Sequence, residues 1–237
     1  LYYWFKIKQK GKIIAEQRGK EEALKFIESN FKKINDPSNK ILLDLAAIYK
    51  NSKKYRESIK LYTSVMSRMD KSSLNYADLL YKRGGSYERI GEFKKSDIDL
   101  LSALELIPNN SYVLNYLAYS WLERDKNINK AILMLEKAYK ENDTDPYIID
   151  SVGWGYYLVG RYLDAERYMR RAIELMPNDP IVNDHYGDIL WKMNRKIQAQ
   201  YFWKSVLRMS DAEKEMKNKI KEKLIKGLPK DKNNESL

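Results

Sequence analysis

The sequence predicts an all-α protein: a right-handed solenoid of about six helix–turn–helix repeats that ends in a capping helix. A period of 34 residues is the main observation, since it aligns Gly84 with Gly153 and Gly187. One helical turn later the same alignment brings Tyr87 together with Tyr156 and with a leucine. A second observation is composition, because 43% of the 237 residues are hydrophobic and no apolar run approaches the roughly 18 residues of a membrane span.

The period divides the chain into six repeats of two helices each. The first two are the weakest matches, although the first keeps the spacing and has Arg18-Gly19 as its turn. Small residues recur where two helices of a repeat touch, and we expect Gly84, Gly153 and Gly187 to permit that close approach. The predicted repeats cover about residues 1–36, 39–72, 77–110, 111–145, 146–179 and 180–213.

Helix starts and loops follow the same register. Asp36-Pro37 and Asp145-Pro146 mark new helices, because proline is tolerated in a first helical turn. The repeat 111–145 has one extra residue, which we place in the loop near 124–129.

A last amphipathic segment, about residues 211–226, places Ala212, Met216, Ile220 and Leu224 on one face. Such a helix covers the apolar side of a final repeat. A helix lying on a membrane surface would look similar, but the mixed Lys and Glu residues favour the cap. Gly227 ends the helix, and we expect residues 227–237 to be disordered.

The net charge of +11 is unevenly distributed. Residues 1–76 carry a net charge of +9, residues 77–179 of −3 and residues 180–237 of +5. Basic ends could meet a polyanion or a membrane surface. A lysine-rich composition also explains them, so the charge by itself does not predict nucleic-acid binding.

Catalytic and cofactor motifs are missing from the sequence. It has no cysteine, so disulfides and cysteine-based metal sites are excluded. His185 is the only histidine, and we expect it to be a packed or surface residue rather than a catalytic one. Asp97 and Asp99 point to different sides of a helix. We therefore predict a non-catalytic protein without a metal or a cofactor.

The aligned glycines, alanines and aromatic residues resemble the tetratricopeptide repeat (TPR), whose period is about 34 residues. In that family, ligands usually lie in a concave groove lined by the first helix of each repeat. The resemblance therefore implies a protein or peptide partner. Carried over to this chain, the lining positions give the candidate partner-binding residues Tyr112, Asn115, Tyr119, Tyr147, Asp150, Trp154, Tyr157, Asp184, Asp188 and Trp191.

The candidate set combines aromatic residues with carboxylates. Tyr and Trp are common anchors of protein interfaces. Asn115 could hydrogen-bond an extended peptide, and Asp150, Asp184 and Asp188 would favour a basic or amine-bearing segment. The alternative is that the aromatic rings pack on neighbouring repeats and the carboxylates are solvated. The lysine and asparagine of the family's carboxylate clamp are absent from the corresponding positions.

Residues 114–203 are similar to the C-terminal repeats of large proteobacterial TPR proteins, most distinctively at Asp150-Ser151-Val152-Gly153-Trp154. Some of those proteins are outer-membrane lipoproteins that act as adaptors for a periplasmic protease. The resemblance implies the periplasm or the periplasmic face of the outer membrane rather than the cytoplasm. Since the chain opens on Leu1 without an initiator Met, we expect any signal, lipid anchor or membrane association to depend on upstream sequence.

Three functions remain open from the sequence. The first is a scaffold or adaptor that binds a peptide or a partner helix in the groove. The alternative is a structural subunit of an envelope assembly that uses its convex face and basic ends. A third is a solenoid that binds RNA or lipid through its lysine-rich ends, with nucleic acid the less expected partner.

Overall fold

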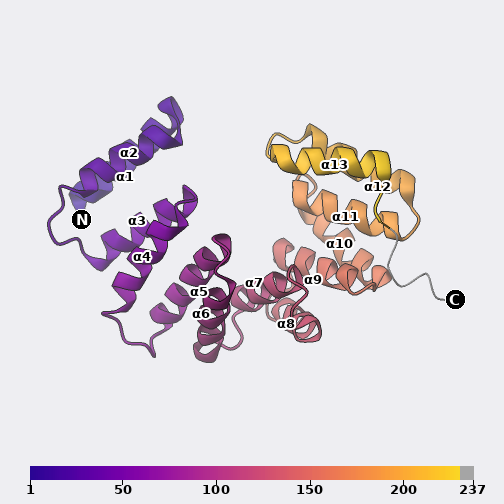
Figure 1. The fold of residues 1–237 in the computed structure, drawn as a ribbon, viewed down its shortest axis with the longest axis horizontal. Helices are drawn as coiled ribbons and strands as arrows, with labels where there is room; N and C mark the ends of the chain where they lie inside the picture. Colours follow the sequence, from indigo (N-terminus) through magenta and orange to yellow (C-terminus); the bar gives the residue numbers. More distant parts are fainter. Residues whose placement is uncertain (230–237) are drawn as a thin grey trace. The chain divides into compact units, whose positions relative to one another are not determined.

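The structure is a computed structural model, and it describes residues 1–229. These residues form thirteen α-helices and no strand. The helices of the first three repeats are α1 (Tyr2–Arg18), α2 (Lys20–Phe31), α3 (Asn39–Asn51), α4 (Tyr55–Met66), α5 (Leu74–Arg89) and α6 (Phe93–Leu106). The others are α7 (Ser111–Leu122), α8 (Ile128–Glu141), α9 (Pro146–Leu158), α10 (Tyr162–Leu175), α11 (Pro180–Lys192), α12 (Lys196–Arg208) and α13 (Lys214–Lys226), all labelled in Figure 1.

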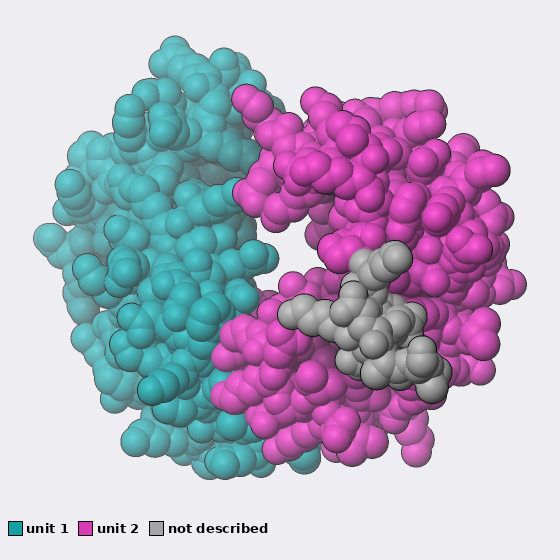
Figure 2. Space-filling model, turned by 45° about the vertical axis from the view of Figure 1, so that its right-hand side comes forward, with its two compact units in different colours: residues 1–108 teal, residues 109–237 magenta. Residues whose placement is uncertain are grey.

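The helices pair as consecutive antiparallel neighbours, which confirms the predicted all-α repeat fold. The chain has two compact units, residues 1–108 with α1–α6 and residues 109–237 with α7–α13, coloured separately in Figure 2. Within each unit, each odd-numbered helix from α1 to α11 packs most closely on the even-numbered helix that follows it, and α13 packs on α12. None of the helices in residues 1–229 is long and apolar enough to cross a membrane.

Small residues bring the two helices of a repeat together, as the sequence predicts. A Cβ atom on Gly153 would lie 3.2 Å from Met169 Cε and 3.3 Å from the Ala165 carbonyl oxygen of α10. A Cβ on Gly187 would collide with the indole of Trp203 on α12. The glycines of α9 and α11 therefore leave room for the large side chains of the second helix.

Side-chain caps start the first helix of each repeat in the second unit. The Asp145 carboxylate accepts hydrogen bonds from the backbone N–H groups of Tyr147 and Ile148, and Pro146 occupies the first turn of α9. Asp179 and Pro180 do the same for α11. These caps satisfy N–H groups that have no partner within the helix.

A left-handed residue closes the turn inside five of the six repeats. This residue is always the fifteenth of its predicted repeat, and its φ angle lies between 51° and 78°. Glycine serves in two repeats, but the other three use side-chain-bearing residues. The five residues are Lys53, Gly91, Asp125, Gly160 and Asn194. The loop with the extra residue, between α7 and α8, has a second left-handed residue, Asn127.

The first repeat is held by a core that includes the opening residues of the chain. Trp4, Ile7, Ile27, Ile41 and Leu45 form one cluster of buried side chains. The Trp4 indole donates a hydrogen bond of 3.0 Å to the Asp44 carboxylate, and Lys8 forms an ion pair with the same group. Helix α1 is thereby attached to α3 as well as to α2.

The last helix, α13, covers the final repeat of the second unit. Ile220 is fully buried beside Trp203, Val206 and Ala212. Leu228 also packs against this cluster, and Lys192 Nζ donates a hydrogen bond to the Pro229 carbonyl oxygen at 2.6 Å. Residues 227–229 of the predicted disordered tail thus contact the repeat, whereas residues 230–237 lie outside the described residues.

Candidate functional site

All ten candidate binding residues lie on α7, α9 and α11, the first helices of three consecutive repeats in the second unit. Helix α9 contacts both α7 and α11. We call the surface formed by Tyr112, Asn115, Tyr119, Tyr147, Trp154 and Tyr157 the α7–α9 face. The remaining candidates, on α9 and α11, make contacts with other side chains of the second unit.

The N-terminal turns of the three helices present an exposed apolar side chain each. Tyr112 is the second residue of α7, Tyr147 of α9 and Ile181 of α11. Their exposed fractions are 51%, 63% and 47%. Because the same position is exposed in three successive repeats, exposure follows from the repeat register and not from one local irregularity.

Asn115 contributes an unsatisfied polar atom to the α7–α9 face. It lies one helical turn after Tyr112 and one turn before Tyr119, so the three side chains share one side of α7. Its Oδ1 atom is buried and accepts no hydrogen bond within the described residues. An unpaired buried acceptor is destabilising by about 1–3 kcal/mol, so a donor from a partner would stabilise this position.

An aromatic stack joins the three repeats. The Trp154 ring lies 3.9 Å from the His185 ring, centroid to centroid, with 12° between the planes. Tyr157 stacks near Trp154 as well, at 4.6 Å and 18°. Trp154 Nε1 donates a hydrogen bond of 2.8 Å to Glu123, which follows the last residue of α7. The indole therefore connects α7, α9 and α11.

His185 is a buried member of this stack, so it is a packed residue, one of the two environments that the sequence predicts for it. Its Nδ1 atom lies 3.0 Å from Asp150 Oδ1, and both side chains are buried. Burial opposes protonation, but attraction to the Asp150 carboxylate and the hydrogen bond outweigh it and raise the pKa of His185. Asp150 is thus the internal partner of His185.

Asp184 and Asp188 are paired with α13. Lys223 Nζ lies 2.5 Å from Asp184 Oδ1 and 2.7 Å from Asp188 Oδ1. Trp203 Nε1 donates a third contact, a hydrogen bond of 3.0 Å, to Asp188. Burial raises the pKa of Asp188 to about 6, although the Lys223 ammonium acts in the opposite direction.

We expected Asp150, Asp184 and Asp188 to attract a basic partner, but the structure pairs all three within the chain. Asp150, Asp184 and Asp188 each have a cationic or hydrogen-bonding partner inside the chain. Solvated carboxylates, the alternative interpretation, are not observed either, because two of the three are buried. We therefore assign the three to the cohesion of the last repeats.

Trp191 is also engaged within the fold. Its ring lies 5.2 Å from the Trp203 ring, and Gly227 approaches it so closely that a Cβ there would overlap the indole. Trp191 belongs to the cluster covered by α13. The sequence could not show this, because the position of α13 depends on tertiary packing.

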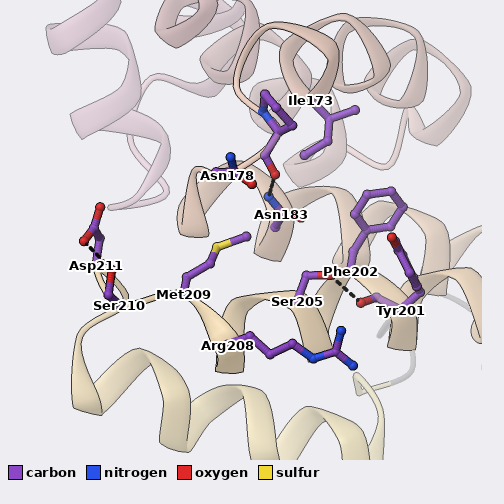
Figure 3. Close-up of a pocket in the computed structure, with 11 residues that line it drawn as sticks. Ile173, Asn178, Asn183, Tyr201, Phe202, Ser205, Arg208, Met209, Ser210 and Asp211 are labelled. Carbon is purple, nitrogen blue, oxygen red and sulfur yellow. Dashed lines mark hydrogen bonds between the residues drawn. The ribbon is translucent and has the colours of Figure 1, made fainter.

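A hollow of the second unit lies elsewhere (Figure 3). It measures about 620 Å³ and is bounded by Ile173, Asn178, Phe202, Arg208 and Met209, among others. Asn183 crosses from α11 to donate a hydrogen bond to the Pro177 carbonyl oxygen. None of the ten candidates lines this hollow. Sequence reasoning missed it, since its walls come from loops as well as helices and follow no motif.

Residues 1–229 contain no group of three or more His, Asp or Glu side chains placed to hold a metal ion.

Six consecutive helix pairs with small residues at helix contacts define a helical-repeat protein. A family model described as "Tetratricopeptide repeat" matches residues 10–212, and the chain belongs to this family. A TPR repeat-containing protein of Pseudomonas aeruginosa is 36% identical over 111 residues, which cover 47% of this chain and 19% of that protein. The match thus spans about a fifth of the relative.

Solved structures show the same fold at low sequence identity. A thermophilic TPR protein from Thermus thermophilus superimposes with a TM-score of 0.66 at 16% identity, covering 79% of this chain and all of that one. A TPR protein from Parabacteroides merdae gives 0.64 at 20%, covering 93% and 86%. PilW, a type IV pilus biogenesis factor, gives 0.64 at 16%, covering 73% and 78%.

Proposed function

We propose that this protein is a non-catalytic scaffold whose α7–α9 face binds a segment of a partner protein. The TPR fold is that of a protein-interaction scaffold. The observation that carries the finer proposal is the combination on α7 and α9: exposed Tyr112 and Tyr147 beside the buried, unpaired Oδ1 of Asn115. A partner that covers the rings and donates an N–H group would satisfy both features.

The chemistry of the face favours an extended or helical segment with apolar side chains. Tyr112 and Tyr147 offer large rings with little entropy to lose, which suits interface anchors. The carboxylates Asp150, Asp184 and Asp188 are paired internally, so a strongly basic segment gains little from them. The proposed partner is therefore recognised by apolar contacts and a backbone hydrogen bond.

Site-specific photo-crosslinking tests this proposal in the source cells. A photoreactive phenylalanine replaces Tyr112 or Tyr147 in one set of variants. In the control set it replaces Leu163 on α10 or Ile197 on α12, which are also exposed apolar residues, at 78% and 86%. A partner crosslinked at positions 112 and 147 and lost on Asn115→Ala supports the proposal.

The convex-face alternative would give the opposite pattern. Leu163 and Ile197 occupy the same position of consecutive repeats, on the second helix of each. Their exposure favours a structural subunit that packs through the second helices. Crosslinks at positions 163 and 197, with none at 112 and 147, would overturn the binding role of the α7–α9 face and support this alternative.

An envelope location is part of the same proposal and depends on the resemblance of residues 114–203 to large proteobacterial TPR proteins. PilW, similar in fold, is itself named as a pilus biogenesis factor. Fractionation of cells that express the complete gene product tests the location. Recovery in the cytosolic fraction alone would contradict it.

A further inference from the structure

An apolar hollow opens in the first unit, remote in sequence from the α7–α9 face. It lies among α1, α2 and α3 and measures about 400 Å³. Its apolar wall consists of Gly11, Ala15, Ala23, Leu24, Ile27 and Ile48. Ligand pockets of about 300–1,000 Å³, mostly apolar with a few polar groups, are typical of small-molecule sites.

Small residues on facing helices create this space. A Cβ on Gly11 of α1 would lie 2.8 Å from Cδ1 of Ile27 on α2, so the two helices approach closely there. One turn further along α1, Ala15 lines the hollow, as Ala23 does on α2. Since neither side chain extends beyond Cβ, the hollow remains open where the helices continue past Gly11.

The charged residues around the hollow are all basic. Lys8, Lys12 and Lys20 line it, and no carboxylate does. Lys8 is already paired with Asp44. Lys12 and Lys20 are exposed and form no ion pair or hydrogen bond with the described part of the chain. The hollow therefore has an apolar wall with two unpaired cations beside it.

We propose that this hollow binds a single-chain anionic amphiphile such as a fatty acid. Its acyl chain would lie against Ala15, Leu24 and Ile48, and its carboxylate would face Lys12 and Lys20. Charge complementarity selects an anion, and the volume suits one chain rather than the broad contact of a protein interface. The site is independent of the proposed partner-binding face.

Titration calorimetry with dodecanoate and decanoate, both below their micelle concentrations, tests the proposal on the full chain. We expect saturable one-to-one binding, with dodecanoate up to about 15-fold tighter, since each buried methylene contributes about fourfold. Dodecyltrimethylammonium, with the same tail and a positive head, should bind at least about tenfold more weakly.

Two variants separate the tail site from the head site. Ala15→Phe fills the hollow and should abolish binding, whereas Ala47→Phe, on the exposed side of α3, should leave it unchanged. Lys12→Gln with Lys20→Gln should weaken dodecanoate binding about threefold to tenfold, as expected for exposed charge pairs. The matched control is Lys40→Gln with Lys60→Gln, exposed lysines away from the hollow.

Circular dichroism tests whether each variant is folded. If Ala15→Phe does not fold, the lysine variants still test the proposal. Binding that is unsaturable, or equal for the cationic amphiphile, would overturn it. Dodecanoate binding that is unchanged both by Ala15→Phe and by Lys12→Gln with Lys20→Gln would also overturn the proposal. An acidic amphipathic peptide that binds where dodecanoate does not would instead assign the hollow to a protein partner.

Discussion

Trp154 and His185 stack face to face, 3.9 Å apart between ring centroids, although they belong to the first helices of different repeats. The Nδ1 atom of the histidine also lies 3.0 Å from Oδ1 of Asp150, which lies one turn before Trp154 on α9. One aromatic pair and one ion pair thus fasten α9 to α11. The same indole donates to Glu123 and so extends the connection to α7.

Replacement of Trp154 by alanine should weaken this connection. We expect a loss of about 2 kcal/mol in the free energy of unfolding, because two ring-stacking contacts and a hydrogen bond are removed from a half-buried position. Urea denaturation measures it. Tyr147→Ala, at an exposed position on the same helix, should change the value by less than about 0.5 kcal/mol. Equal effects would contradict the structural role of Trp154.

Protonation of His185 should stabilise the second unit. Because the pKa of His185 is raised in the folded state, its contribution is fully present below the unfolded value of about 6.5. That contribution is lost as the pH rises through the folded pKa. The parent should therefore lose stability relative to His185→Gln as the pH increases above about 6.5. The groups that face the ring are Asp150, Asp184, Asp188 and Trp154.

The single histidine makes this measurement direct. One imidazole resonance titrates in a proton NMR spectrum, and its midpoint in the folded protein should lie above about 6.5. Thermal melts of parent and variant over the same pH range give the linked stability. A midpoint below 6.5 would reverse the predicted sign.

Removal of Lys223 should release α13. With Lys223→Met, Asp184 and Asp188 lose their cation, and we expect a destabilisation of about 3 kcal/mol, as for other buried pairs broken on one side. Hydrogen exchange of the α13 amides should accelerate. Adding Asp184→Asn and Asp188→Asn to Lys223→Met should recover much of the loss, since neither carboxylate is then left as a charge without its cation. Unchanged exchange in α13 would show that apolar packing alone holds it.

The left-handed turn residues provide a stability test in each unit. Lys53→Gly should stabilise the first unit by up to about 1 kcal/mol, because a left-handed conformation is unfavourable for a side-chain-bearing residue. Gly160→Ala, at the same place in another repeat, should destabilise by about 1 kcal/mol. Thermal unfolding measures both. Effects of the same sign would contradict the equivalence of the two turns.

Much of the fold could be predicted from the sequence because repeat spacing is a local property. Asp145-Pro146 begins α9 as predicted, through contacts within one turn, whereas Asp36-Pro37 lies before α3, which begins at Asn39. Gly153 and Gly187 recur at places where two helices touch. The sequence did not predict the left-handed conformations of Lys53 and Asp125. Lys53 is left-handed because the fifteenth position of its repeat requires it, and lysine itself has no preference for that conformation.

In the candidate site, the sequence predicted the position of the residues but not the partners of their side chains. The repeat register places Tyr112, Tyr147 and Trp154 on the first helices, which the structure shows. The register could not show that Asp150 is paired with His185, or that Asp184 and Asp188 are paired with Lys223. Those contacts join residues of different helices, and their geometry exists only after the helices have packed.

The sequence alone determined the all-α repeat architecture, because a 34-residue period of small and aromatic residues specifies which helix faces must meet. Tertiary structure decided which polar groups are available to a partner. Burial makes an unpaired charge unfavourable, so Asp150, Asp184 and Asp188 are paired inside the chain, whereas Tyr112 and Tyr147 remain exposed.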